Sequence, residues 1–132
     1  MMRHIVLIAV GGSLGAVARY GLTGLVHKHF KGLFPLGTLA VNLAGCLLIG
    51  VIMGLVVQRQ LFAPGTRIFL LVGFLSSFTT LSTVSYETFQ FLHDTEIALA
   101  LGNILANAIG GIVLVAVGWL AVRFFAGFGG IS

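Results

Sequence analysis

Residues 36–57 read LGTLAVNLAGCLLIGVIMGLVV and contain no charged side chain. A bilayer core about 30 Å thick is crossed by about 20 apolar residues in a helix, so this stretch predicts a membrane-spanning helix. Three further stretches meet the same requirement, at residues 4–26, 68–92 and 97–125. All four are continuous runs, without the alternation of apolar and polar residues that a membrane β-strand shows. We therefore expect an all-α membrane protein in which residues 1–132 form a single domain of four transmembrane helices.

The composition excludes several other classes of protein. The chain has 132 residues, of which 58% are hydrophobic and only 8% charged, and its mean hydropathy is +1.14. A water-exposed surface needs about three times as many charged residues, so a soluble globular domain is excluded. Cys46 is the single cysteine, which rules out an intrachain disulfide. The net charge of +4 comes from basic residues scattered between apolar blocks, whereas a nucleic-acid site gathers them into a patch.

The loop charges give only a weak orientation signal. The side of the membrane that holds the N-terminus carries four basic residues, namely Arg3, Arg59, Arg67 and Arg123, and the other side carries Lys28 and Lys31. Orientation follows the excess of Lys and Arg in short loops. This small excess fits an ordinary cytoplasmic N-terminus, and it also fits a chain that inserts in both orientations. In the second case, two inverted copies would supply the related halves that many transport folds need.

Small residues recur at helix-packing spacing. Gly11 and Gly15 are four residues apart, as are Gly50 and Gly54, and a third row consists of Gly102, Ala106 and Gly110. Small residues at this spacing let helix backbones approach closely in lipid. We therefore expect these rows to mark contacts between helices.

The centre of the third span is unusually polar. Residues 76–85 read SSFTTLSTVS and carry seven hydroxyl groups. An intact helix can absorb Ser and Thr by hydrogen bonds to its own carbonyls. A run that covers every face of the helix favours a helix broken near its centre, with backbone and hydroxyl groups facing a protected interior. Carbonyls released in such a place can hold a bare cation.

Three further polar side chains lie inside the spans. Glu87 either extends to the interface or is buried and functional, and it shares a helix face with Thr83. Asn42 offers two donors and one acceptor, for another helix or for a permeating ion. Arg19 either extends toward the Lys28 side or draws anions by its field. No nucleophile and base, phosphate loop or metal cluster accompanies them, so an enzyme is not expected.

These residues resemble the Fluc (CrcB) family of small fluoride channels. The likeness runs nearly end to end, through Gly11-Gly12-x-x-Gly15-x-x-x-Arg19, Gly37-Thr38-x-x-x-Asn42-x-x-Gly45, and Gly73 followed by Thr79-Thr80-x-Ser82-Thr83-x-Ser85-x-Glu87. The resemblance implies an antiparallel, dual-topology homodimer with two pores in the inner (plasma) membrane. It also implies passive export of fluoride from the cytoplasm. The composition itself makes the lipid bilayer a partner of the chain and excludes nucleic acid.

The resemblance also implies roles for particular residues. Asn42 would donate to fluoride in the pore, Arg19 would mark the vestibule, and the family's polar track would consist of Ser82, Thr83 and Glu87. A structural sodium ion would lie on the dimer axis. Its ligands would be the backbone carbonyls of Ser76 and Thr79 from each subunit.

The chain departs from the family at two pore-lining positions. The family usually has two phenylalanines there, three residues apart, whereas this chain has Leu81 and Val84. An aromatic ring edge is electropositive, and neither Leu nor Val offers one. One alternative is therefore a non-conducting subunit, or one that needs a different partner chain. A second alternative is a proton-coupled four-helix exporter with Glu87 as its acid, and a third is a scaffold that only packs through its glycines.

Overall fold

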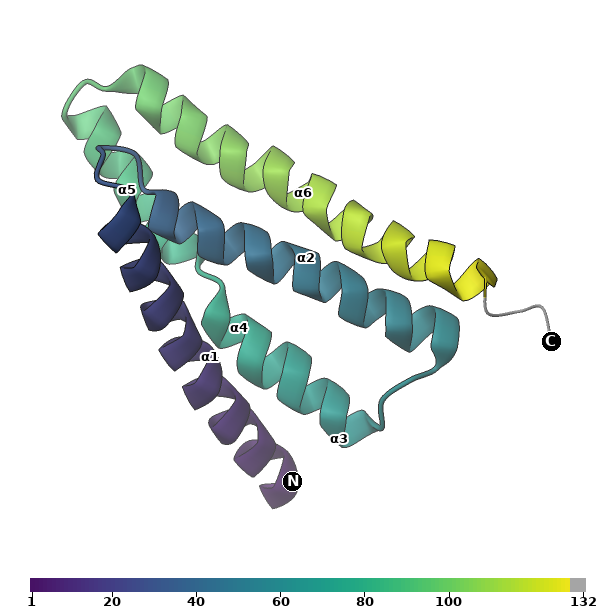
Figure 1. Ribbon diagram of the computed structural model, residues 1–132. Coiled ribbons are helices and arrows are strands. Elements are labelled where there is room, and N and C mark those ends of the chain that lie inside the picture. Colours follow the sequence, from purple (N-terminus) through teal and green to yellow (C-terminus); the bar gives the residue numbers. More distant parts are fainter. Residues whose placement is uncertain (129–132) are drawn as a thin grey trace.

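The computed structural model describes residues 1–128, and every regular element in that range is a helix (Figure 1). The first, second and fourth spans are α1 (Met2–His29), α2 (Leu36–Arg59) and α6 (Ile97–Phe128). The third span consists of α3 (Pro64–Arg67), the π-helix η1 (Ile68–Leu75), α4 (Ser76–Phe78) and α5 (Leu81–His93). Within the described residues, four stretches are long and apolar enough to cross a membrane, which confirms the predicted all-α membrane architecture.

Local sequence signals set several helix ends. Pro64 occupies the first turn of α3, where its missing N–H costs nothing because that group has no partner within the helix. After α2, Gln60 adopts a left-handed conformation with φ 50°, which turns the chain out of the helix. Thr95 has φ 62° in the short loop between α5 and α6. The connections are therefore tight, and successive spans lie close together in the bundle.

The third span changes neighbours along its length. Its first half, η1, packs mainly against α1, whereas its second half, α5, packs against α6. Helix α2 runs along α6 and also touches α1 and each part of the third span from η1 to α5 (Figure 1). The junction between α4 and α5 therefore lies where the third span passes from one packing partner to the other, beside α2.

Glycines make the closest helix contacts, as their spacing predicts. A Cβ atom on Gly11 would lie 2.6 Å from the carbonyl oxygen of Phe69, and one on Gly15 would overlap the carbonyl oxygen of Phe74. In the same way, a Cβ on Gly50 would overlap the carbonyl oxygen of Val115 in α6. Helix α1 thus approaches η1, and α2 approaches α6, to distances that only glycine permits.

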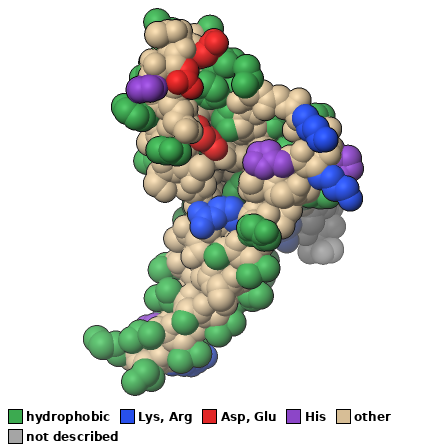
Figure 2. All heavy atoms as spheres, turned by 90° about the vertical axis from the view of Figure 1, so that its left-hand side faces the viewer, with side chains coloured by type: hydrophobic (Ala, Val, Ile, Leu, Met, Phe, Trp, Pro, Cys, Tyr) green, Lys and Arg blue, Asp and Glu red, His purple; other side chains and the backbone are tan. Residues whose placement is uncertain are grey.

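The molecule has a small core and an apolar exterior. Among the residues whose side chains the structure describes, five hydrophobic ones are buried, and the outer faces of all four spans expose large apolar side chains. Figure 2 shows apolar side chains spread over the visible face, with the acidic ones gathered at one end of the molecule. A soluble protein would not tolerate so much exposed apolar surface, whereas lipid solvates it. The exterior therefore fits a bilayer.

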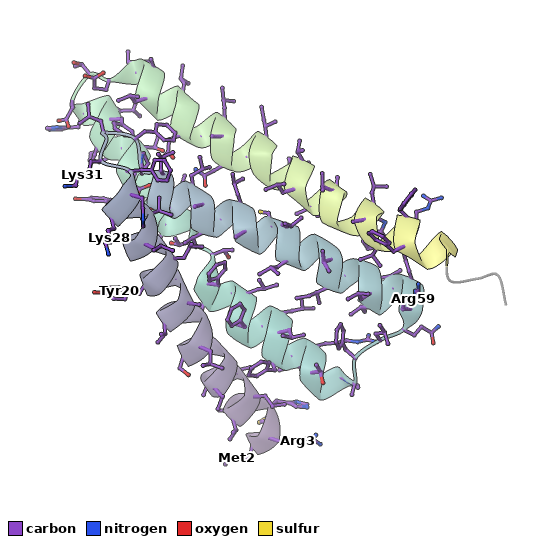
Figure 3. All side chains as sticks on the ribbon, viewed as in Figure 1. Met2, Arg3, Tyr20, Lys28, Lys31 and Arg59 are labelled. Atoms are coloured by element: carbon purple, nitrogen blue, oxygen red, sulfur yellow. The ribbon has the colours of Figure 1, made fainter. Side chains whose placement is uncertain are left out.

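Basic side chains mark the two ends of the bundle. Lys28 and Lys31 lie at the end where α1 leads into α2, and Arg3 and Arg59 lie at the opposite end (Figure 3). This placement agrees with the two membrane faces inferred from the sequence.

Candidate functional site

The helix of the third span is interrupted in the middle of its hydroxyl-rich stretch. Helix α4 ends at Phe78 and α5 begins at Leu81 (Figure 1). Between them, Thr79 (φ −83°, ψ 159°) and Thr80 (φ −152°, ψ 112°) are extended. Neither glycine nor proline occurs in residues 74–101, so neither of these helix-breaking residues causes the interruption.

Asn42 pairs with the backbone of Thr80 in both directions. The N–H of Thr80 donates to Asn42 Oδ1 at 2.8 Å, and Asn42 Nδ2 donates to the carbonyl oxygen of Thr80 at 3.2 Å. One amide side chain on α2 thereby satisfies both polar groups of a residue that lies outside the helix. Unpaired backbone groups at membrane depth cost several kcal/mol each, roughly, so this pairing stabilises the interruption.

The Thr80 hydroxyl caps the second half of the span. Its Oγ1 accepts from the backbone N–H of Thr83 at 3.3 Å, which is the usual N-cap arrangement. The same hydroxyl lies 2.9 Å from Thr83 Oγ1 and 3.2 Å from Ser82 Oγ. Thr80 therefore joins the backbone at the interruption to two of the hydroxyls in the predicted polar track.

These two side chains release two backbone carbonyls. In a continuous helix, the carbonyl of Ser76 would accept from the N–H of Thr80, and that of Thr79 from the N–H of Thr83. Here the first N–H donates to Asn42 and the second to Thr80 Oγ1. Released carbonyl oxygens are ligands of the kind that hard cations bind. The residues predicted as cation ligands thus fit such a role.

A chain of amide side chains extends from Asn42 across the bundle. Asn42 Nδ2 donates to Asn107 Oδ1 at 2.9 Å. Asn107 Nδ2 in turn donates to the backbone oxygen of Asn103 at 2.9 Å and to its Oδ1 at 3.1 Å. Asn103 is fully buried and donates to Thr88 Oγ1 at 3.1 Å. Asn107 thus joins α6 to α2, and Asn103 joins α6 to α5.

Glu87 is held by a hydroxyl from the second span. Thr38 Oγ1 donates to Glu87 Oε1 at 2.5 Å, and the Thr38 residue is buried. This pairing places the carboxyl group between α2 and α5 and away from the loop acids Asp94 and Glu96. Of the two sequence interpretations for Glu87, the structure favours a partnered group inside the bundle.

Two cavities have Thr80 in their linings. The first has a volume of about 580 Å³, and its polar lining consists of Arg19, Tyr20, Thr23, His27, Thr38, Thr80 and Thr83. The second, of about 410 Å³, is lined in part by Asn42, Ser76, Thr79, Thr80, Leu81, Val84 and Asn107. Among the described residues, Arg19 has no hydrogen-bond or ion-pair partner, so its charge acts on the first cavity uncompensated.

The predicted site residues divide between these cavities. Arg19 and Thr83 line the first cavity, and Glu87 reaches its wall through Thr38. The second cavity brings together Asn42, both predicted cation ligands and the two residues that replace phenylalanine. Ser82 is exposed and lines neither cavity, although its hydroxyl contacts that of Thr80.

Leu81 and Val84 differ in their surroundings although both line the second cavity. Leu81 is 80% exposed, whereas Val84 is 5% exposed. Leu81 therefore lies at the open edge of the cavity in a single chain, and Val84 lies on its packed side.

Two residues of this site were not assigned a role from the sequence. Thr38 and Thr80 belong to the quoted motifs, but the motifs do not show what either residue contacts. Their partners are distant in the chain, so local spacing does not reveal them.

The fold and the site define a small multi-pass membrane protein whose third span is interrupted beside two cavities that contain polar residues. The chain belongs to the CrcB family, because the family model described as "CrcB-like protein, Camphor Resistance (CrcB)" matches residues 6–119. The family expected from the sequence motifs is thus confirmed, and the protein is a multi-pass protein of the cell membrane.

Similar proteins come from bacteria and an archaeon. The fluoride-specific ion channel FluC of Geotalea uraniireducens is 42% identical over 121 residues, which cover 92% of this chain and 95% of that protein. The fluoride-specific ion channel FluC 1 of Methanosarcina acetivorans is 42% identical over 127 residues, or 96% of each chain. FluC of Geobacter sulfurreducens is 48% identical over 106 residues, or 80% of this chain and 86% of that protein.

Proposed function

We propose that this chain is a fluoride-selective ion channel that lets fluoride leave the cytoplasm passively. The family match over residues 6–119, which reaches into all four spans, carries this proposal. The alignments with proteins named as fluoride-specific ion channels span nearly the whole length of both chains, and they support the proposal. The protein is a channel and not an enzyme.

The proposed path runs from the first cavity to the second past Thr80. Arg19 attracts anions into the first cavity, since its charge there is uncompensated. Fluoride holds water tightly and must exchange it for fixed hydrogen-bond donors. Thr83 and Ser82 supply hydroxyls close to Thr80, and Glu87 completes the polar track. Asn42 supplies amide hydrogens in the second cavity, beside Leu81 and Val84.

The interruption at Thr79 and Thr80 is proposed to break the third span inside the bilayer and to hold a structural sodium ion. The carbonyls of Ser76 and Thr79 are its proposed ligands, because their helical donors are engaged elsewhere. The partial negative charges of these carbonyl oxygens would stabilise the bound sodium ion, so the site would need no charged side chain. Two such carbonyls from each of two subunits would give four ligands.

The working unit is proposed to be an antiparallel homodimer. The nearly even loop charges allow insertion in both orientations. Ser76 and Leu81 are exposed on the single chain although both line the second cavity. The polar part of this open cavity, which includes Asn42 and Thr79, is better covered by a second copy than by lipid.

Labelling of a tag in the loop after Arg59 tests this arrangement. The tag should react with a membrane-impermeant reagent added on either side, with each side labelling a large fraction of molecules. Labelling from one side alone, in every molecule, would contradict the antiparallel dimer.

Flux from liposomes tests the function. Liposomes that contain this chain alone and no proton gradient should release internal fluoride. Release that requires a proton gradient would indicate an exporter instead, and no release in either condition would indicate a subunit that does not conduct.

A further inference from the structure

We infer that Asn42 and Thr80 are positioning residues that keep the Ser76 and Thr79 carbonyls available to a cation, and that Asn107 holds Asn42 in place. This inference rests on the proposed sodium site and adds to it the residues that maintain it. It gives Asn42 a second task besides donation to fluoride.

The interruption needs such residues because the local sequence does not demand it. Ser and Thr are poor helix formers by only a few tenths of a kcal/mol, roughly, relative to average residues. A helix through residues 76–83 would regain four backbone hydrogen bonds that the interruption gives up, from the N–H groups of residues 80–83 to the carbonyls of residues 76–79. Side chains must therefore compensate, and the Asn42 amide of α2 and the Thr80 hydroxyl engage two of these four N–H groups.

Each side chain blocks one of these four helical bonds. Asn42 Oδ1 engages the N–H of Thr80, which is the helical donor for the Ser76 carbonyl. Thr80 Oγ1 engages the N–H of Thr83, which is the helical donor for the Thr79 carbonyl. The proposed cation ligands correspond one to one with these two bonds.

The orientation of the Asn42 amide is fixed from both ends. Its oxygen must face the Thr80 N–H, so its two hydrogens face the Thr80 carbonyl and Asn107 Oδ1. Asn107 cannot rotate its amide without losing its bond to the backbone oxygen of Asn103, which can only accept. Asn103 is fixed in turn by Thr88 and by the backbone oxygen of Val84. Each amide from Asn42 to Asn103 therefore has a single orientation of its oxygen and nitrogen.

The two tasks of Asn42 depend on different atoms. Its oxygen holds the interruption, whereas its hydrogens would serve fluoride. Asn42→Asp keeps an oxygen for the Thr80 N–H and removes both hydrogens, and Asn42→Leu removes all three groups at similar volume. Thr80→Ser keeps the capping oxygen, whereas Thr80→Val removes it and preserves shape.

The readout is the unfolding temperature of the purified protein in detergent, measured against sodium concentration with N-methyl-D-glucamine as the replacement cation. The parent protein should be stabilised by sodium. Asn42→Leu and Thr80→Val should raise the half-saturating sodium concentration by about tenfold or more, the equivalent of one lost hydrogen bond. Thr80→Ser should retain the sodium response, because it keeps the capping oxygen.

Gln90→Leu is the matched control, because Gln90 is an exposed amide whose one hydrogen bond goes to the Tyr86 hydroxyl. It should leave the sodium response unchanged. Should Asn42→Leu fail to fold, the Thr80→Val and Thr80→Ser pair decides the matter with the same readout. A normal sodium response in Thr80→Val would overturn the inference. A parent protein without any sodium response would overturn it together with the sodium site, whereas the proposed channel function is judged separately by fluoride efflux.

Discussion

The hydrogen bond between Thr38 and Glu87 should contribute measurably to stability. The distance of 2.5 Å between Thr38 Oγ1 and Glu87 Oε1 falls in the range of about 2.5–2.7 Å found for hydroxyl donors to carboxylates. Hydrogen bonds to charged groups are worth about 1.5–3 kcal/mol, and neutral ones about 0.5–1.5 kcal/mol. Thr38→Val preserves the shape of this buried side chain and removes only the donor. Thr38→Val should lower the free energy of unfolding by about 1.5–3 kcal/mol if Glu87 is ionised and by about 0.5–1.5 kcal/mol if it is protonated.

A double-mutant cycle isolates this interaction. Glu87→Gln keeps an acceptor for Thr38 but removes the charge, so Thr38→Val should cost about 1 kcal/mol less in that background. The assay is reversible unfolding in detergent micelles for the parent, the two single variants and the double variant. Thr66→Val is the control, because Thr66 is exposed, and its effect should stay within about 0.5 kcal/mol. Equal losses from Thr38→Val in both backgrounds would refute a bond to a charged carboxylate.

Three further predictions concern the pore and the packing. Asn42→Asp should abolish fluoride efflux from liposomes, since it puts a negative charge on the anion path, and unchanged efflux would remove Asn42 from the pore. Leu81→Phe combined with Val84→Phe should raise fluoride flux without raising chloride flux, because ring edges favour a small anion. Each single change should raise fluoride flux less. Val84→Phe should destabilise the protein more than Leu81→Phe, because Val84 is buried and Leu81 is exposed. A double variant that is no faster, or is faster for chloride too, would contradict this. Gly15→Ala should lower the yield of folded protein, because its Cβ would overlap the Phe74 carbonyl oxygen. Gly21→Ala is the control, because its Cβ meets nothing within 4 Å, and it should fold in the same yield as the parent. Equal yields for the two variants would refute the close approach of α1 to η1.

Much of the architecture follows from the sequence because lipid imposes a simple rule. Apolar runs long enough to cross a bilayer must be helical, so the four spans are predictable from composition and length. The glycine contacts are predictable for a similar reason, since Gly11 and Gly15 recur at the spacing of one helix face.

The site is less predictable because its contacts join distant parts of the chain. The hydroxyl run favours an interruption, yet nothing in residues 76–85 shows that Thr80 would be the residue held by Asn42. That bond joins residues 38 positions apart, and the bond from Thr38 to Glu87 joins residues 49 positions apart. Which polar groups meet depends on how α2 crosses the third span, and spacing along one helix carries no such information. Family resemblance supplied the roles of Asn42 and Glu87, but not these partners.

The central claim is that this chain alone forms a passive path for fluoride. Its most direct test is fluoride efflux from liposomes that contain only this protein and potassium fluoride, followed with a fluoride electrode. A passive channel moves net charge, so efflux should be slow until valinomycin allows potassium to follow, and should then become rapid. Liposomes loaded with potassium chloride should release no chloride under the same conditions. Rapid fluoride release without valinomycin, equal release of chloride, or no release at all would contradict the account.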